Sequence, residues 1–128
     1  MRLLGIDYGR KKIGLAISEG ILAEPLCVVR YSDINVLIER IKRIIKEHEI
    51  EKVVVGVSEG VIGKESKKFS QGLSQGLQIP VETFDETLST HNAQITSIEA
   101  GIKRKKRKDM EDAYASTLIL QEYLDSAI

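Results

Sequence analysis

The stretch LLGIDYGRKKIGLAIS, residues 3–18, decides the fold. Its two apolar runs, 3–7 and 13–18, are separated by the polar residues 8–12, which is the pattern of two strands joined in a β-hairpin. Gly9 is expected to supply the positive φ that a tight turn requires. The chain is therefore predicted to open with an antiparallel pair of strands.

A carboxylate stands at the end of the first of these strands. Asp7 closes the apolar run, and Arg10, Lys11 and Lys12 follow in the turn. A lone Asp at such a position is often a turn residue that bonds its own backbone. The functional interpretation is that the strand end presents the carboxylate and Gly9 permits close approach of a ligand, since a carboxylate beside cations suits a hard divalent ion together with a phosphate group.

Beyond the hairpin, the spacing of apolar residues predicts strands that alternate with helices. Asp33 precedes apolar residues three and four apart and is expected to cap that helix. Such alternation favours parallel pairing, whereas the opening hairpin favours an antiparallel edge. The predicted fold is α/β and ribonuclease H-like, with a mixed five-stranded sheet flanked by helices. The other predicted elements are strands at 26–30, 53–57 and 81–84, a loop with Gly60 and Gly63, and helices at 64–77, 87–100 and 110–127, with Gly101 between the last two.

Length and composition indicate one globular domain over residues 1–128. Apolar residues make up 42% of the chain and charged residues 30%, which argues against wholesale disorder. No apolar run approaches the roughly 20 residues of a membrane span, and Asp7 interrupts the apolar N-terminus, so neither a membrane segment nor a secretory signal is expected. Cys27 is the single cysteine, which excludes an internal disulfide and favours the cytoplasm. The 19 basic and 19 acidic residues give zero net charge, so any attraction to phosphate must come from local clusters.

A second candidate carboxylate lies in DETLST, residues 85–90. Glu86 fits a helix-capping box that begins at Thr83, which is the structural interpretation. The segment holds more polar groups than one cap needs, and Ser89 and Thr90 could bond phosphate oxygens from a first helical turn. Glu86 is therefore also a candidate ligand.

A third candidate, Asp112, opens the last predicted helix. Asp109 and Glu111 compete with it, since any acid favours the N-terminal end of a helix. Asp112 shares a helix face with Ala115 and Ser116, and these small residues would let that face pack closely on the sheet. Just upstream is a block of six cations that could each neutralise a phosphate: Lys103, Arg104, Lys105, Lys106, Arg107 and Lys108.

Four separate segments resemble one known family. IDYGRKKIGLAIS, VVVGV with its glycine loop, DETLST, and KRKKRK followed by the last helix occur in the order and near the spacing of the YqgF (RuvX-type) family. Its members are described as Holliday junction resolvases and as nucleases that process the 5′ end of pre-16S ribosomal RNA. The resemblance implies a ribonuclease H-like fold with Asp7, Glu86 and Asp112 as the acidic site. Ser58 and Glu59 stand where the family usually has Leu-Pro, and Glu59 is either an extra ligand or a solvated loop residue.

The leading hypothesis is a nuclease dependent on Mg²⁺ or Mn²⁺, with Asp7, Glu86 and Asp112 as metal ligands. Its expected partner is structured nucleic acid, either precursor rRNA or branched DNA, and the protein is expected to be a monomer or a weak homodimer. A non-catalytic nucleic-acid-binding module is one alternative. An ATP-binding domain of the actin-like kinase type is another, because residues 6–14 resemble the phosphate-binding hairpin of those enzymes. The expected nucleic-acid contacts are Arg10, Lys11, Lys12, Ser89, Thr90 and the cations 103–108.

Overall fold

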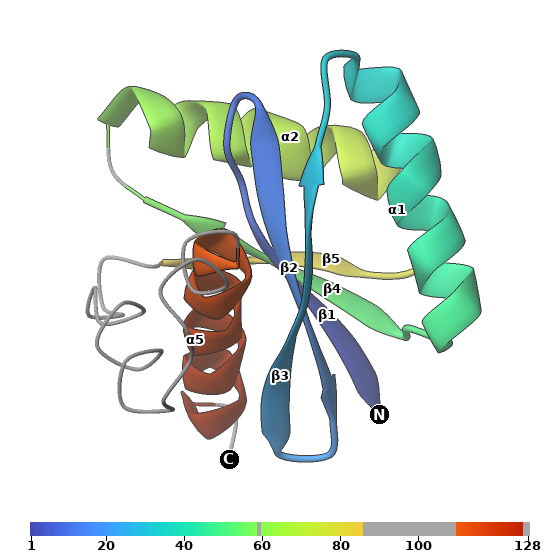
Figure 1. The fold of residues 1–128 in the computed structure, drawn as a ribbon, viewed down its shortest axis with the longest axis vertical. Coiled ribbons are helices and arrows are strands. Elements are labelled where there is room, and N and C mark those ends of the chain that lie inside the picture. The colour runs from blue at the N-terminus through green and yellow to red at the C-terminus, as the bar shows by residue number, and fades with distance from the viewer. Residues whose placement is uncertain (59, 86–109, 127–128) are drawn as a thin grey trace.

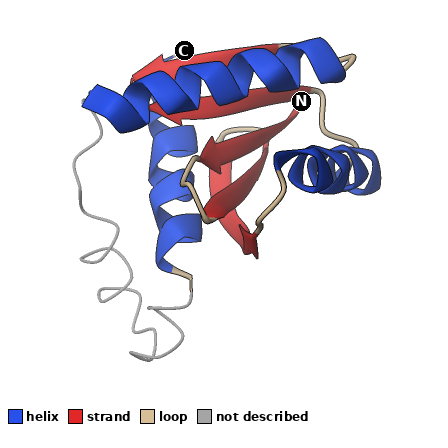
Figure 2. Ribbon diagram, turned by 90° about the horizontal axis from the view of Figure 1, so that it is seen from above, coloured by secondary structure: helices blue, strands red, loops and turns tan. Residues whose placement is uncertain are grey.

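The structure is a computed structural model that describes residues 1–58, 60–85 and 110–126. These form a five-stranded sheet with helices on both faces (Figures 1 and 2). The strand order is β3-β2-β1-β4-β5, with antiparallel pairing from β3 to β1 and parallel pairing from β1 to β5. The predicted mixed sheet is therefore confirmed. The elements are β1 (Arg2–Asp7), β2 (Lys12–Glu19), β3 (Leu22–Arg30), α1 (Ile34–His48), β4 (Lys52–Val57), α2 (Gly60–Gly76), β5 (Val81–Asp85) and α5 (Glu111–Ser126).

The opening hairpin is present, but it requires glycine at position 9 for a different reason from the one predicted. Among the described glycines, positive φ occurs at Gly20 and Gly60 and not at Gly9. A Cβ at Gly9 would lie 2.4 Å from the carbonyl oxygen of Lys12, inside any real contact distance. The turn therefore requires glycine because its own backbone approaches closely.

β3 is longer than predicted, since it begins at Leu22 rather than at residue 26. The tight turn at Gly20, with φ of 76°, returns the chain directly onto β2. Pro25 lies just before the predicted strand, yet it pairs with Ala16 beside a register shift that leaves Leu26 of β3 without a register partner on β2. β3 is the sheet edge, where a residue without a backbone N–H is tolerated.

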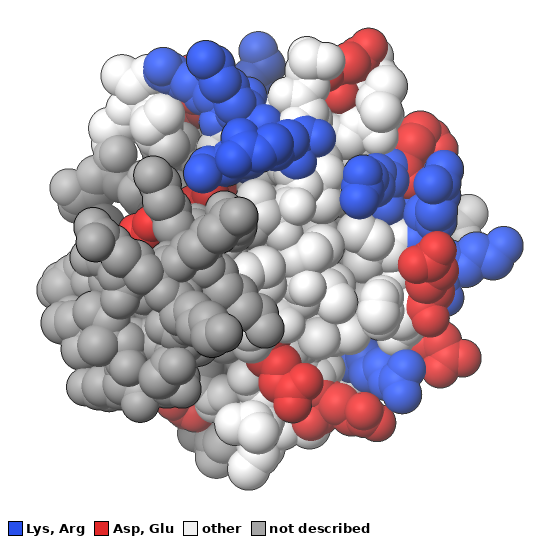
Figure 3. All heavy atoms as spheres, viewed as in Figure 1, with Lys and Arg blue, Asp and Glu red and all other residues white. Residues whose placement is uncertain are grey.

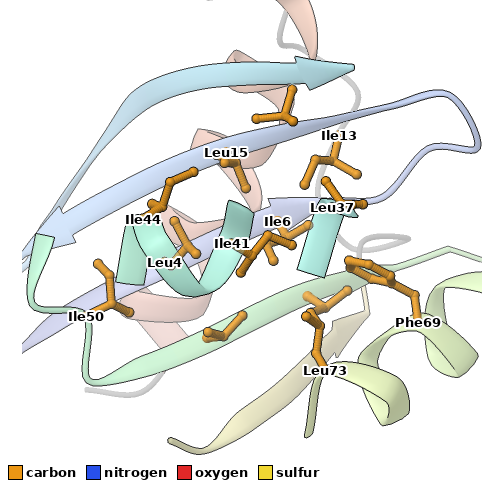
Figure 4. Packing of buried hydrophobic residues seen from close by; sticks show 13 residues of the cluster. Leu4, Ile6, Ile13, Leu15, Leu37, Ile41, Ile44, Ile50, Phe69 and Leu73 are labelled. Atoms are coloured by element: carbon orange, nitrogen blue, oxygen red, sulfur yellow. The ribbon is translucent and has the colours of Figure 1, made fainter. Parts of the chain in front are cut away.

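The two faces of the sheet bury separate hydrophobic clusters. On one face, Leu37 and Ile41 of α1 and Phe69 and Leu73 of α2 pack over the strands (Figure 4). Each fully buried side chain of this size contributes about 2 kcal/mol to folding. As predicted, Asp33 caps α1, accepting a hydrogen bond of 2.8 Å from the Asn35 backbone N–H. On the other face, α5 covers a smaller cluster of Leu3, Ala16, Ala23, Val54 and Leu120.

The loop predicted around Gly60 and Gly63 is instead the start of α2, which begins four residues before the predicted position. Gly63 lies within the helix, and its position requires glycine because a Cβ there would stand 1.7 Å from the Ser58 carbonyl oxygen. This glycine therefore marks close packing of backbone on backbone. Sequence reasoning mistook it for a loop residue.

The strands predicted at 53–57 and 81–84 and the helix predicted at 110–127 are present. The start of β4, the end of β5 and the start of α5 each differ from the prediction by one residue. The helix predicted at 87–100 and its stop at Gly101 lie outside the described residues. No helix in the described part of the chain is both long enough and apolar enough to cross a membrane.

Candidate active site

Asp7 lies at the C-terminal end of β1, the central strand of the sheet. Its register partners are Gly14 on β2 and Gly56 on β4, so neither flanking position carries a side chain. Gly5, two residues earlier on the same face of β1, is the point where α5 crosses, because a Cβ at Gly5 would lie 2.9 Å from the Leu120 Cβ. The Asp7 side chain is therefore on the α5 face of the sheet.

Asp112 reaches the same place from the other end of the chain. It is the second residue of α5, and its carbonyl oxygen would stand 1.9 Å from a Cβ at Gly14. The first turn of α5 thus rests directly on the register partner of Asp7. Of the two small residues predicted to pack here, Ser116 is fully buried and Ala115 is only partly buried, whereas Ala113, which was not predicted, is fully buried.

Lys12 joins this arrangement as the ion-pair partner of Asp112. The Lys12 ammonium lies 3.1 Å from an Asp112 carboxylate oxygen, with 42% of the Lys12 side chain and 31% of the Asp112 side chain exposed. Lys12 and Gly14 are alternate residues of β2 and so share the α5 face. A cation expected to bind phosphate is therefore also the counter-charge of a candidate metal ligand.

Contacts from β3 and α2 hold the turn after Asp7. The Tyr31 hydroxyl donates a hydrogen bond to the Gly9 carbonyl, and the Tyr31 backbone N–H donates to the Lys11 carbonyl at 3.0 Å. Burial, followed by the nearby Tyr8 hydroxyl, raises the pKa of Tyr31, so the phenol stays protonated and remains a donor. The rings of Tyr8 and Phe69 lie 5.0 Å apart. The backbone that follows the candidate ligand is thereby fixed against the core.

Arg10 ties the same turn to α2. Its guanidinium donates a hydrogen bond of 2.9 Å to the Glu65 carboxylate. That hydrogen bond, and the charge of Arg10, lower the pKa of Glu65, while the same hydrogen bond raises the pKa of Arg10. Arg10 thus contacts a carboxylate, and only Lys11 of the three turn cations has no ion-pair partner recorded within the described residues.

Two of the three predicted metal ligands lie within the described residues. Asp7 and Asp112 carry carboxylate oxygens, the ligand type that Mg²⁺ and Mn²⁺ prefer, and both belong to the α5 face near Gly14. Within residues 1–58, 60–85 and 110–126, no group of three or more His, Cys, Asp or Glu is placed to hold a metal ion. The other predicted residues lie outside the described residues: Glu59, Glu86, Ser89, Thr90, Lys103, Arg104, Lys105, Lys106, Arg107 and Lys108.

Positive charge gathers around this end of the molecule. In the space-filling view, Lys and Arg side chains cover the region of the β1–β2 turn and the first half of α2 (Figures 1 and 3). Sequence reasoning had included the turn cations but had missed Glu65 and the exposed lysines of α2. The signal was available, since Lys64, Lys67 and Lys68 recur at helical spacing on one polar helix.

The sequence model of a family described as "RuvX: Holliday junction resolvase" matches residues 1–126. The chain belongs to this RuvX family. A protein of Thermoanaerobacter pseudethanolicus named "Putative pre-16S rRNA nuclease" is 42% identical over 98% of this chain and 97% of its own length. A Clostridium acetobutylicum protein of the same name is 37% identical over 98% of this chain and 99% of its own. The resemblance drawn from the four sequence segments is therefore confirmed.

Solved structures confirm the ribonuclease H-like fold of this RuvX-family protein. The RuvC protein of T. thermophilus, solved in complex with a Holliday junction substrate, aligns with a TM-score of 0.65 at 18% identity, over 99% of this chain and 95% of that one. The fowlpox virus resolvase, solved with Holliday junction DNA, aligns with a TM-score of 0.65 at 16% identity, over 100% and 99%. At such low identities the likeness concerns the fold alone.

Proposed function

We propose that this RuvX-family protein is a nuclease that hydrolyses phosphodiester bonds in structured nucleic acid, using Mg²⁺ or Mn²⁺ held by Asp7, Glu86 and Asp112. The observation that carries the proposal is the contact of the first turn of α5 with Gly14, because it brings Asp112 to the strand end that carries Asp7. Full-length relatives named as pre-16S rRNA nucleases and the family's description as a resolvase support the reaction class.

Glu86 enters the proposal from its place in the sequence. Phe84 packs with the cluster under α5, on the same face as Asp7. Asp85 alternates with Phe84 along β5 and therefore lies on the opposite face. This placement of Asp85, together with the family resemblance, favours Glu86 as the third carboxylate.

The chain's own groups have distinct roles in this proposal. A bound divalent ion would supply the charge that activates water and stabilises the leaving oxygen. Asp7 and Asp112 would hold the ion on the α5 face, and Lys12 neutralises the charge of Asp112 when no ion is bound. Lys11 and the cations of residues 103–108 bind backbone phosphates, which gives affinity without sequence preference. Cytoplasmic location, a single domain, and a monomeric or weakly dimeric state stay predictions.

Cleavage of matched labelled substrates tests the proposal. A precursor 16S rRNA leader is the first substrate because the full-length relatives carry that name, and a four-way DNA junction is the second because the family is described as resolvases. Wild type is expected to cut one of them with Mg²⁺ or Mn²⁺ and not with EDTA. Asp7→Asn is expected to cut about 100-fold more slowly or not at all, since several kcal/mol of metal stabilisation are lost.

The control is binding of the same substrates by both proteins in the same buffers. In the buffer with EDTA, Asp7→Asn should bind about as well as wild type, because it keeps every cationic side chain. Equal binding with no cutting by either protein, under any metal, would replace the nuclease with a non-catalytic nucleic-acid-binding module.

A further inference from the structure

A pocket of about 360 Å³ opens at the carboxyl ends of the parallel strands, as Asp7 does, but on the opposite face of the sheet. It lies where β4 and β5 end and α2 begins, and its polar lining includes Ser58, Lys64, Lys67, Thr83 and Asp85. The mechanism proposed above uses none of these residues.

Strand alternation assigns the pocket to the α2 face. Val81 packs with the cluster under α1 and α2, whereas Phe84 packs with the cluster under α5. Thr83 and Asp85 alternate with Phe84 and therefore share the face of Val81. The pocket and the Asp7 side chain thus lie on opposite faces of the sheet, at the same end of its parallel strands.

The charge of the pocket suits a phosphate. Lys64 and Lys67 line it together with Ser58 and Thr83, whose hydroxyls can donate hydrogen bonds to phosphate oxygens. Asp85 is the carboxylate of the lining, so two cations face one anion. Glu65 lies on the same helix, but Arg10 neutralises it.

The lining also argues against a free nucleotide. The lining residues that the structure describes include no aromatic side chain on which a base could stack. A ligand held here is recognised by its phosphate and not by its base. A nucleic-acid backbone, which presents a phosphate at every nucleotide, fits this chemistry.

We propose that this pocket binds a backbone phosphate of the nucleic acid that the candidate active site cleaves, with Lys64 and Lys67 as its cations. This inference rests on the proposed function. β1 and β5 are separated by two strand spacings, roughly 10 Å. Since a nucleic-acid strand rises about 3.4 Å per nucleotide, the bound phosphate lies a few nucleotides from the scissile one. The nucleic-acid strand would then pass over the carboxyl end of β4, which lies between β1 and β5.

Salt-dependent binding tests the pocket separately from cleavage. Binding of the four-way DNA junction is measured between 50 and 200 mM salt in the Asp7→Asn background, so that no substrate is cut. Lys64→Gln/Lys67→Gln is expected to lower the slope of log K against log salt by about 0.9, which is one phosphate contact. The matched control is Lys42→Gln/Lys46→Gln on α1, which removes the same charge near the other end of α2 and should leave the slope within about 0.2 of the parent.

A second pair of variants places the effect in the pocket without removing a cation. Thr83→Glu adds a carboxylate that faces the phosphate and should weaken binding about tenfold at low salt, whereas the uncharged Thr83→Gln should weaken it far less. Thermal melting of each variant shows that the fold is retained.

The outcomes separate this inference from the function on which it rests. Equal slopes for the Lys64/Lys67 variant and its α1 control would overturn the proposed phosphate site, even if wild type cleaves its substrate. A lower slope together with weaker binding by Thr83→Glu, with no cleavage of either substrate by wild type, would support the phosphate site and contradict the nuclease activity. Failure of the parent protein to bind either substrate, the four-way junction or the precursor rRNA leader, would overturn both.

Discussion

The Lys12 ammonium pairs with Asp112 at 3.1 Å, while its neighbours in the turn face solvent. A divalent ion held by Asp112, as proposed, would lie close to this ammonium and be repelled by it. Because both side chains are partly exposed, water and salt would weaken the repulsion without removing it. Under the proposed function, Lys12 would therefore oppose metal binding while it favours phosphate binding.

Replacing Lys12 should therefore change the affinities for Mn²⁺ and for nucleic acid in opposite directions. Lys12→Gln should bind Mn²⁺ about 3- to 10-fold more tightly than wild type, since like charges about 4 Å apart cost on the order of 1 kcal/mol in water. The same variant should bind nucleic acid more weakly, with a lower salt dependence. Isothermal titration calorimetry with Mn²⁺ measures the first effect. Lys11→Gln removes the same charge one residue away and should change Mn²⁺ affinity much less; equal effects of the two variants would contradict the role of Lys12.

At the scale of the elements, the position of α5 on the sheet depends on two glycines. Gly5 and Gly14 let the helix backbone approach β1 and β2 so closely that no Cβ fits between them. Gly14→Ala would place its methyl group 1.9 Å from the Asp112 carbonyl oxygen, so α5 must shift. We expect a loss of about 1–3 kcal/mol in the free energy of unfolding, measured by urea denaturation.

Gly72→Ala is the matched control, since a Cβ at that position of α2 has no neighbour within 4 Å. It should stabilise the protein by about 0.5–1 kcal/mol, because alanine favours a helix over glycine. Gly14→Ala should also weaken Mn²⁺ binding, whereas Gly72→Ala should not. Similar stability for both alanine variants would show that α5 does not depend on contact at Gly14.

The elements also show which parts of the fold the sequence predicts. Local patterns, such as the hairpin at 3–18 and the capped helix at Asp33, are confirmed because their cause lies within a few residues. Gly9 and Gly63 were misread because close approach and turn formation select the same residue. The Lys12–Asp112 ion pair was not predicted, since it joins opposite ends of the chain. Both its members had been chosen as site residues from their own surroundings.

In the molecule as a whole, Asp7 and Asp112 come to the same end of the sheet only in the folded state. Asp7 ends the first strand, and Asp112 lies in the first turn of the last described helix, so the unfolded chain does not hold them together. A ligand that binds the folded state alone stabilises it by mass action. Metal binding by the proposed carboxylates would therefore stabilise the fold, whatever the rate of cleavage.

This linkage predicts a stabilisation that can be measured without substrate. Mn²⁺ at about 100 times its dissociation constant should add about 2.7 kcal/mol to the free energy of unfolding, which raises the melting temperature by several degrees. Asp7→Asn and Asp112→Asn should each lose most of this increment, because each removes a carboxylate ligand from the same ion. Asp125→Asn, at the exposed far end of α5, removes a carboxylate away from the site and should retain it. An increment of equal size in all of these variants would mean that Mn²⁺ binds elsewhere on the protein, and the carboxylate site would then have to be abandoned.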